Sequence, residues 1–165
     1  MLSPGPHFQL LEALVSANVD FIVVGGMAAV LSGVPIVTAD LDIVHQRNAE
    51  NADRLLDVLR NLRSYVRADL SDRKLFPSPA HLLGRGHINL MTDLGPLDLL
   101  CEIANGLGYE QLLPDSEWVV SGGARLRVLS LPKLIEVKSQ AGRLKDRMAI
   151  PVLLATLEEL RRNRP

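Results

Sequence analysis

The sequence has a single cysteine, Cys101, and few aromatic residues. One cysteine excludes an intrachain disulfide and any zinc site built from cysteines. Aromatic residues make up 4% of the chain, so we expect an aliphatic core and no series of aromatic platforms for single-stranded nucleic acid. No segment approaches the roughly 18 consecutive apolar residues of a membrane span. Residues 1–6 lack the basic start and apolar run of a signal peptide. These absences predict a cytoplasmic protein without a membrane partner.

The composition is that of an ordinary globular protein. Hydrophobic residues make up 47% and charged residues 22% of the 165 residues. A chain of this length buries roughly 68–70% of its unfolded surface, which is enough for one sizeable core. We therefore expect a single domain over residues 1–165, with a core at about residues 20–130 and a C-terminal helical segment at about residues 131–162.

The two ends of the chain differ in charge. Residues 1–123 contain 8 Lys and Arg against 15 Asp and Glu, whereas residues 124–165 contain 10 against 4. The basic C-terminal segment is most simply a solvated helix face. The alternative is a cationic wall that faces an anionic ligand bound by the rest of the chain.

Apolar periodicity and turn residues predict an alternation of helices and strands. The expected helices lie at residues 7–18, 27–31, 48–62, from 131 onward and 146–162, and the expected strands at 21–24, 38–44, 87–92, 97–103 and 125–129. Residues 64–86 are expected to form a loop or an irregular edge strand, and residues 105–123 a loop around Trp118. The strands on either side of residues 93–96 form an antiparallel hairpin. This order predicts an α+β fold, in which a mixed β-sheet is covered by helices.

Two carboxylates alternate on the second expected strand. Asp40 and Asp42 are two residues apart, so their side chains project from the same face. A third carboxylate, Asp98, lies among leucines in the second strand of the hairpin. Anions this close repel one another unless a cation lies between them, and hard divalent ions such as Mg²⁺ bind oxygen ligands of this kind. Adjacent strands would therefore gather the three carboxylates into one metal site for phosphoryl transfer. In the alternative, Asp40 and Asp42 merely border a strand and Asp98 faces solvent.

Two glycines separate the first expected strand from the short helix that follows it. Backbone N–H groups after Gly25 and Gly26 would be free to receive a phosphate at the positive end of the helix. The alternative is an ordinary tight turn between a strand and a helix. Residues 25–29 do not match the G-x-G-x-x-G pattern, which excludes a dinucleotide-binding fold.

Together these features resemble the DNA polymerase β-like nucleotidyltransferase superfamily. The strand that ends in Gly25 and Gly26, the 13 residues that follow, the Asp40-Leu41-Asp42 segment and the later Asp98 carry the resemblance. Residues 24–28 and 33–42 are similar to small bacterial nucleotidyltransferase-like proteins, including toxin–antitoxin relatives. Residues 131–138 and the sequence Gly-Arg-Leu-Lys-Asp at 142–146 are similar to the lysine-bearing helix and the Gly-Arg-x-Lys-Asp turn of those proteins. The resemblance covers residues 20–46 and 87–160.

The resemblance implies a metal-dependent transfer of a nucleoside monophosphate from a nucleoside triphosphate to an acceptor hydroxyl. Asp40 and Asp42 would bind two Mg²⁺ or Mn²⁺ ions, and Asp98 would bind one of them and help to deprotonate the acceptor. The acceptor stays open between a protein, a tRNA and a small molecule such as an antibiotic.

The resemblance also implies the residues that hold the triphosphate. The backbone amides of Gly25 and Gly26 would bind the β- and γ-phosphates. Lys138, with Arg143 or Lys145, would neutralise the triphosphate, which would also account for the basic end of the chain.

Two departures from the family favour an alternative function. Many relatives have an arginine shortly before the aspartate segment, where this chain has Pro35, Ile36 and Val37, and many active transferases have serine in place of Gly26. The alternative is a catalytically inactive module with the same fold, which binds a nucleotide or a partner protein. Either function is compatible with a role in a toxin–antitoxin pair.

Overall fold

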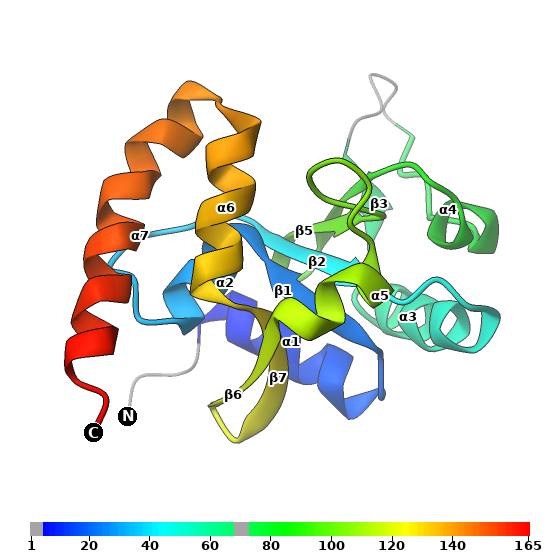
Figure 1. Ribbon diagram of the computed structural model, residues 1–165. Coiled ribbons are helices and arrows are strands. Elements are labelled where there is room, and N and C mark those ends of the chain that lie inside the picture. The colour runs from blue at the N-terminus through cyan, green and yellow to red at the C-terminus, as the bar shows by residue number, and fades with distance from the viewer. Residues whose placement is uncertain (1–4, 68–72) are drawn as a thin grey trace.

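The structure is a computed structural model that describes residues 5–67 and 73–165 (Figure 1). Its elements in chain order are α1 (Pro6–Ser16), β1 (Phe21–Val24), α2 (Gly25–Leu31), β2 (Leu41–His45), α3 (Ala49–Asn61), β3 (Tyr65–Val66), α4 (Pro79–Leu83), β4 (Ile88–Thr92), β5 (Gly95–Leu100), α5 (Tyr109–Leu112), the 3₁₀ turn η1 (Leu113–Asp115), β6 (Ser116–Ser121), β7 (Ala124–Leu129), α6 (Leu131–Ala141) and α7 (Leu144–Arg162). Among the described residues, no helix combines the length and the apolar character needed to cross a membrane.

The strands form one mixed sheet in the order β3-β4-β5-β2-β1-β7-β6. β2 pairs with β5 and β1 with β7 in parallel, whereas β1 with β2, β3 with β4, β4 with β5 and β6 with β7 are antiparallel. The expectation of an α+β fold with a mixed sheet and a central hairpin is therefore confirmed. The centre of the sheet consists of β1, β2 and β5. All of β1 and most of β2 are buried on both faces, whereas buried and half-buried residues alternate along β5.

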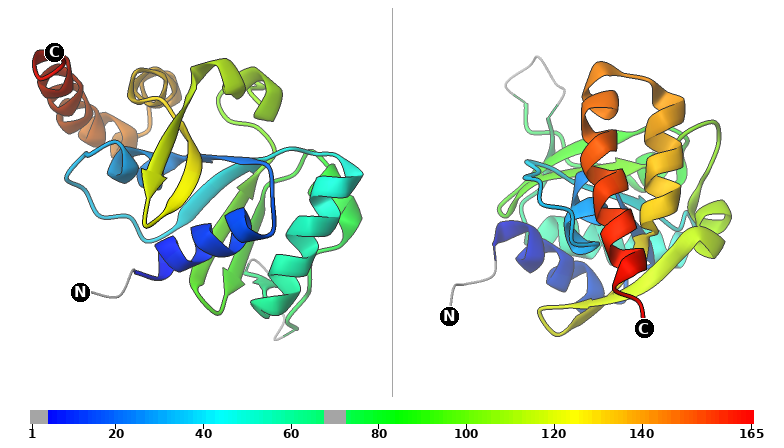
Figure 2. Two further views of the ribbon diagram at one scale, coloured as in Figure 1. Left: turned by 90° about the horizontal axis from the view of Figure 1, so that it is seen from below. Right: turned by 60° about the vertical axis from the view of Figure 1, so that its left-hand side comes forward.

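Helices cover both faces of this sheet (Figure 2). α1 and α3 pack together on one face, and α2, α5 and α6 lie on the other. The core between these layers is aliphatic, as the scarcity of aromatic residues predicts. Its largest fully buried side chains include Leu10, Leu14, Ile22, Leu41, Ile43, Leu55 and Leu59.

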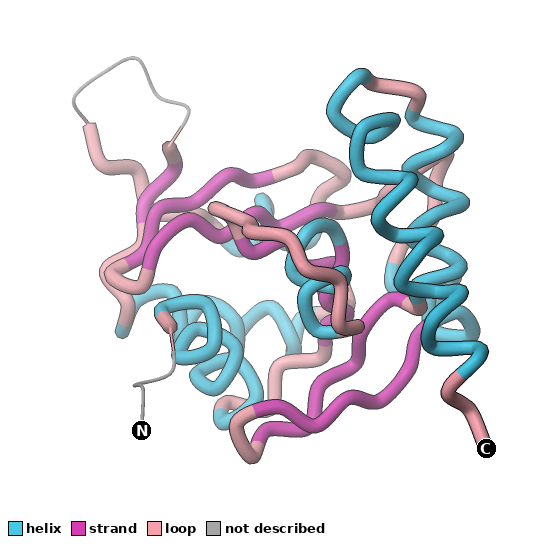
Figure 3. The backbone as a smooth tube through the Cα atoms, turned by 90° about the vertical axis from the view of Figure 1, so that its left-hand side faces the viewer, coloured by secondary structure: helices cyan, strands magenta, loops and turns pink. Residues whose placement is uncertain are grey.

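The C-terminal helices form an antiparallel pair at one side of the sheet (Figure 3). Ser130 caps α6, because its side chain accepts a hydrogen bond from the backbone N–H of Lys133. α6 ends at Gly142, which has a φ of 63° that favours glycine. The interruption expected at Gly142 is therefore confirmed, and α7 begins two residues later.

Several expected boundaries were wrong. Residues 105–123 contain the strand β6 besides the short α5. In residues 64–86 the expected edge strand is present as the two-residue β3, but the short helix α4 was not expected; residues 68–72 lie outside the described part of the chain. β6 was not predicted because its exposed positions include the apolar residues Trp118 and Val120, so apolar and polar residues do not alternate along it. β2 begins at Leu41, so Asp40 lies just before the strand, and α2 begins at Gly25.

Candidate active site

Strand pairing brings the expected carboxylates together. Asp42 on β2 is directly opposite Asp98 on β5 in the parallel pair, and opposite Val24 at the end of β1. Residues that are paired in this way point to the same face of a sheet. Asp40 precedes Asp42 by two residues, immediately before β2 begins. The adjacency on which the proposed metal site depends is therefore present.

The turn between β1 and α2 lies directly against Asp42. A Cβ atom at Gly25 would clash with the Asp42 carboxylate, and Gly25 also has a φ of +64°. Both features disfavour any residue other than glycine at this position. The short approach places the backbone at the start of α2 beside the carboxylate pair.

Gly26 lies close to Thr38, which is on the loop before β2. A Cβ atom at Gly26 would be 2.7 Å from the Oγ1 atom of Thr38. The Thr38 hydroxyl in turn donates a hydrogen bond to the carbonyl oxygen of Asp40 at 3.0 Å. A side chain at position 26 would therefore require Thr38 to move.

The negative charges of Asp40, Asp42 and Asp98 repel one another. Burial, and after it the charges of Asp98 and Asp40, raise the pKa of Asp42 from 3.8 to about 6, although the charge of Lys145 acts in the opposite direction. An added cation would remove this repulsion. The electrostatics therefore favour a bound cation at Asp42.

Arg67 supplies one cation to this cluster, and the sequence reasoning missed it. Its guanidinium forms an ion pair with Asp98, and both side chains are largely buried, with 28% and 16% of their surface exposed. The backbone N–H of Arg67 donates to the carbonyl oxygen of Asn89 at 2.8 Å, and Asn89 is opposite Asp98 on β4. The residue follows the two-residue strand β3, which is too short to give a periodic signal in the sequence.

The three carboxylates are oxygen ligands of the kind that a hard divalent ion prefers. In this structure, however, they do not form a complete metal site. Within residues 5–67 and 73–165, no three His, Cys, Asp or Glu side chains converge closely enough to hold a metal ion. The Asp98 carboxylate instead faces Arg67. Carboxylate oxygens are the ligands that Mg²⁺ and Mn²⁺ prefer, so Asp40, Asp42 and Asp98 have the donor chemistry of such a site.

The three expected cations divide into two kinds. Lys138 and Arg143 both contact Asp146, at 3.3 Å and 2.7 Å, and Asp146 is only 2% exposed. Burial raises the pKa of Asp146, but the hydrogen bonds from Arg143 and Lys138 outweigh burial and hold that pKa below its usual value. Lys145 is exposed, and its charge acts on Asp42. Of the three, Lys145 is the cation whose charge lowers the pKa of Asp42.

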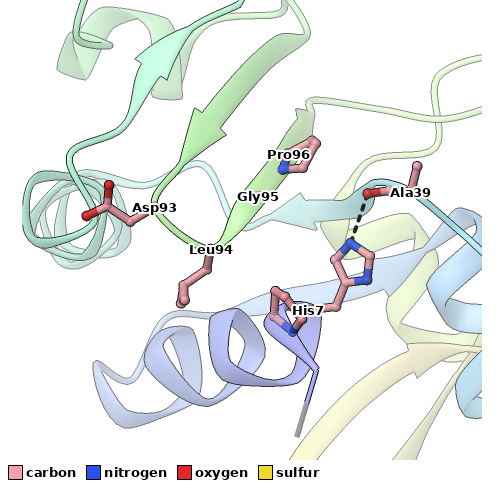
Figure 4. A pocket seen from close by; sticks show the side chains of 7 residues that line it. His7, Ala39, Asp93, Leu94, Gly95 and Pro96 are labelled. Carbon is pink, nitrogen blue, oxygen red and sulfur yellow. Dashed lines mark hydrogen bonds between the residues drawn. The ribbon is translucent and has the colours of Figure 1, made fainter.

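A cavity of about 370 Å³ adjoins the same end of the carboxylate strands (Figure 4). Its walls include His7, Ala39, Gly95 and Pro96. Ala39 directly precedes Asp40 and Pro96 is two residues before Asp98, but neither carboxylate lines the cavity. The His7 Nε2 atom lies 2.9 Å from the carbonyl oxygen of Ala39, and this hydrogen bond ties α1 to the chain entering β2.

Comparison with known proteins identifies the fold. No protein-family model matches the chain, and no curated protein matches it in sequence. Among solved structures, the lincosamide antibiotic adenylyltransferase LnuA, bound to lincomycin, is similar with a TM-score of 0.62 and 14% identity, over 92% of this chain and 96% of that chain. The antibiotic-resistance factor ANT(2'')-Ia, in complex with adenylyl-2''-tobramycin, has a TM-score of 0.56 and 16% identity, over 92% and 87% of the two chains. A candidate nucleotidyltransferase from Thermotoga maritima has a TM-score of 0.53 and 18% identity, over 90% of each chain. The chain therefore has the fold of these nucleotidyltransferases.

Proposed function

We propose that the protein transfers a nucleoside monophosphate from a nucleoside triphosphate to an acceptor hydroxyl and releases pyrophosphate. The observation that carries this proposal is the direct pairing of Asp42 with Asp98 beside the Gly25 turn. Two carboxylates held next to a backbone turn suit a reaction that needs both metal and phosphate binding. The fold shared with adenylyltransferases supports the same reaction.

Asp40, Asp42 and Asp98 would hold Mg²⁺ or Mn²⁺. When bound, the metal ions neutralise the triphosphate charge and favour the ionised acceptor hydroxyl. Asp98 accepts the proton of that hydroxyl. The hydroxyl oxygen forms a bond to the α-phosphorus, and the bond from this phosphorus to the oxygen that bridges to the β-phosphate breaks, so that pyrophosphate leaves.

The backbone amides at Gly25 and Gly26 hold the β- and γ-phosphates in this proposal, because the first turn of a helix leaves N–H groups without an intrahelical partner. Lys145 neutralises the triphosphate directly. Lys138 and Arg143 act through Asp146, since their ion pairs fix the turn that carries Lys145.

The test measures pyrophosphate release and nucleotide binding with each of the four nucleoside triphosphates, with and without Mg²⁺ or Mn²⁺. Lincosamides and aminoglycosides are the first acceptors to try, because the structural neighbours are complexes with such compounds or their adducts; tRNA and proteins follow. Asp42→Asn should abolish release, whereas Asp57→Asn should not, because Asp57 is an exposed residue that pairs with Arg60 on α3. Absence of nucleotide binding under every condition would contradict the proposal.

One observation favours the second candidate, a module of this fold that binds a nucleotide or a partner protein without turnover. Asp98 is engaged by Arg67, so the carboxylate that would accept the proton is already paired. Nucleotide binding without pyrophosphate release from any triphosphate would support this alternative. Its partner in a toxin–antitoxin pair would be sought by copurification with the product of the neighbouring gene.

A further inference from the structure

A second pocket lies at the opposite end of β1 from the Gly25 turn. Its volume is about 280 Å³, and its walls come from the end of α1, the start of β1, α5, β6 and β7. It contains Phe21, the first residue of β1, whereas Gly25 follows the last residue of that strand. At a rise of about 3.3 Å per residue, the two positions are about 13 Å apart. None of the residues proposed to act in nucleotide transfer lines this pocket.

Two arginines and the tryptophan form one wall. Arg125 and Arg127 are two residues apart on β7, and Trp118 on β6 is directly opposite Arg127. Both guanidinium groups stack on the Trp118 ring, 4.3 Å and 4.5 Å from its centroid. We call this wall, together with the cavity beside it, the Trp118 pocket.

The positive charge of this wall has no counter-ion within the described ranges of the chain. Neither Arg125 nor Arg127 forms an ion pair or hydrogen bond with an acidic residue there, although acidic residues outnumber basic ones in residues 1–123. Asp20, which also lines the pocket, is already paired with Arg54 at 3.2 Å. Two neighbouring cations without a carboxylate partner repel each other, and a bound anion would relieve this repulsion.

Contact with the Trp118 ring leaves the N–H groups of both arginines able to bind a ligand. These groups lie at the edge of the guanidinium, where they match the two oxygens of a carboxylate or phosphate. Tyr109 adds a hydroxyl donor, and burial raises the pKa of that phenol, so it stays protonated at neutral pH.

The volume and the polarity of the pocket further restrict the class of ligand that it can bind. A volume of about 280 Å³ is just below the range of roughly 300–1,000 Å³ typical of small-molecule pockets, so the pocket suits a ligand smaller than a nucleoside triphosphate. Trp118 is 51% exposed and gives the pocket an apolar surface next to the two charges. We propose that the Trp118 pocket binds a small organic anion, in which a carboxylate or phosphate monoester is attached to an apolar body.

The chain itself supplies the probe for this proposal, because Trp118 is its only tryptophan. Tryptophan emission of the full-length protein is followed during titration with benzoate, phenyl phosphate, and the neutral analogue benzamide, at constant ionic strength. Benzoate or phenyl phosphate should produce a saturable change, and comparison of the two shows whether a carboxylate or a phosphate is preferred. Benzamide should produce no saturable change, because it lacks the charge.

Variants separate the two arginines from general effects of charge. Arg127→Gln and Arg125→Gln should each weaken binding about tenfold or more, since each removes a charge-assisted hydrogen bond. Arg161→Gln is the matched control, because it removes the same charge from an exposed position near the end of α7. Asp42→Asn should leave the titration unchanged, so failure of nucleotide transfer and failure of this inference can be distinguished.

A second measurement tests ligand binding without relying on arginine variants, which can fold poorly. Benzoate or phenyl phosphate should raise the thermal midpoint of the wild-type protein and of Arg161→Gln by equal amounts. Signals that grow linearly with every ligand, that are equal for benzamide, or that persist in a folded Arg125→Gln, Arg127→Gln double variant would overturn the proposal.

Discussion

Two regions of the molecule contain partly or fully buried aspartates, and the surroundings shift the pKa values of these aspartates in opposite directions. At the turn between α6 and α7, Asp146 is held by two cations, Lys138 and Arg143, and its pKa lies below its usual value. At the end of β1, Asp42 shares its surroundings with two further carboxylates, and burial together with these charges raises its pKa to about 6.

The difference separates structural charge from functional charge. An aspartate whose ion pairs are complete contributes to the fold and has nothing left to bind. An aspartate among uncompensated anions costs stability in the free protein and gains it when a cation arrives. The same residue type is therefore expected to respond to mutation with opposite signs in the two regions.

The largest expected effect is on turnover at the carboxylate cluster. Asp42→Asn keeps the size of the side chain but removes its charge, so the rate of pyrophosphate release should fall by about a thousandfold, the upper range for loss of one electrostatic contact to the transition state. Steady-state release with the best nucleotide measures the effect. Asp57→Asn serves as the control, and equal activity of the two variants would show that Asp42 has no part in the reaction.

The second largest effect is expected on the free energy of unfolding, when the ion pairs of Asp146 are removed. Asp146→Asn leaves Lys138 and Arg143 without their counter-ion, and we expect the free energy of unfolding to fall by about 2–3 kcal/mol. The loss stays below the full cost of breaking a buried pair because Arg143 is 77% exposed and can turn to water. Urea unfolding measures it. Asp57→Asn on α3, whose ion pair is fully at the surface, should lose less than about 1 kcal/mol.

The pH dependence of stability provides a third contrast. A carboxyl group with a raised pKa binds its proton more tightly in the folded state, so it favours folding at low pH and opposes it once ionised. Metal-free protein should therefore lose stability at Asp42 as the pH rises from about 4 to about 6, by about 1–2 kcal/mol, since Asp42 keeps some contact with water. Urea unfolding in the presence of a chelator should show that Asp42→Asn removes this part of the pH dependence. If the free energy of unfolding depends on pH in the same way in Asp42→Asn as in the wild type, then ionised Asp42 does not destabilise the metal-free protein.

The two regions also differ in how far their contacts could be predicted from the sequence. Asp40, Asp42 and the Gly25 turn could be found because their spacing is local, and Asp98 because a hairpin and its neighbouring strand are a short extrapolation. Arg67 could not be found, because its contact with Asp98 spans 31 residues and follows a strand of two residues. Lys138 and Arg143 were identified as cations, but their shared partner depends on how α6 packs against α7, which no local pattern specifies.

Arg67 allows the smallest and most specific test of the comparison, because its ion pair with Asp98 gives the carboxylate cluster part of the compensation that Asp146 has in full. If Asp98 binds a metal ion together with Asp40 and Asp42, that ion competes with Arg67 for the Asp98 carboxylate. Removing the arginine therefore has two opposite effects. The metal-free protein becomes less stable by about 1 kcal/mol through loss of a charge-assisted hydrogen bond, and the metal binds more tightly because it no longer competes with a resident cation.

The measurement is the thermal midpoint as a function of Mn²⁺ concentration, since a ligand that binds only the native state adds RT ln(1 + [L]/Kd) to stability. We expect Arg67→Gln to reach half of the maximal shift at about a tenfold lower Mn²⁺ concentration than the wild type, which corresponds to about 1.4 kcal/mol of lost competition. Arg63→Gln is the control, because Arg63 pairs with Asp93 in the same way but is 81% exposed. If Arg67→Gln lowers the metal-free midpoint and leaves the Mn²⁺ dependence equal to that of Arg63→Gln, then Arg67 is a structural partner of Asp98. Asp98 would in that case be held by its ion pair as Asp146 is, and the metal site would have to do without Asp98.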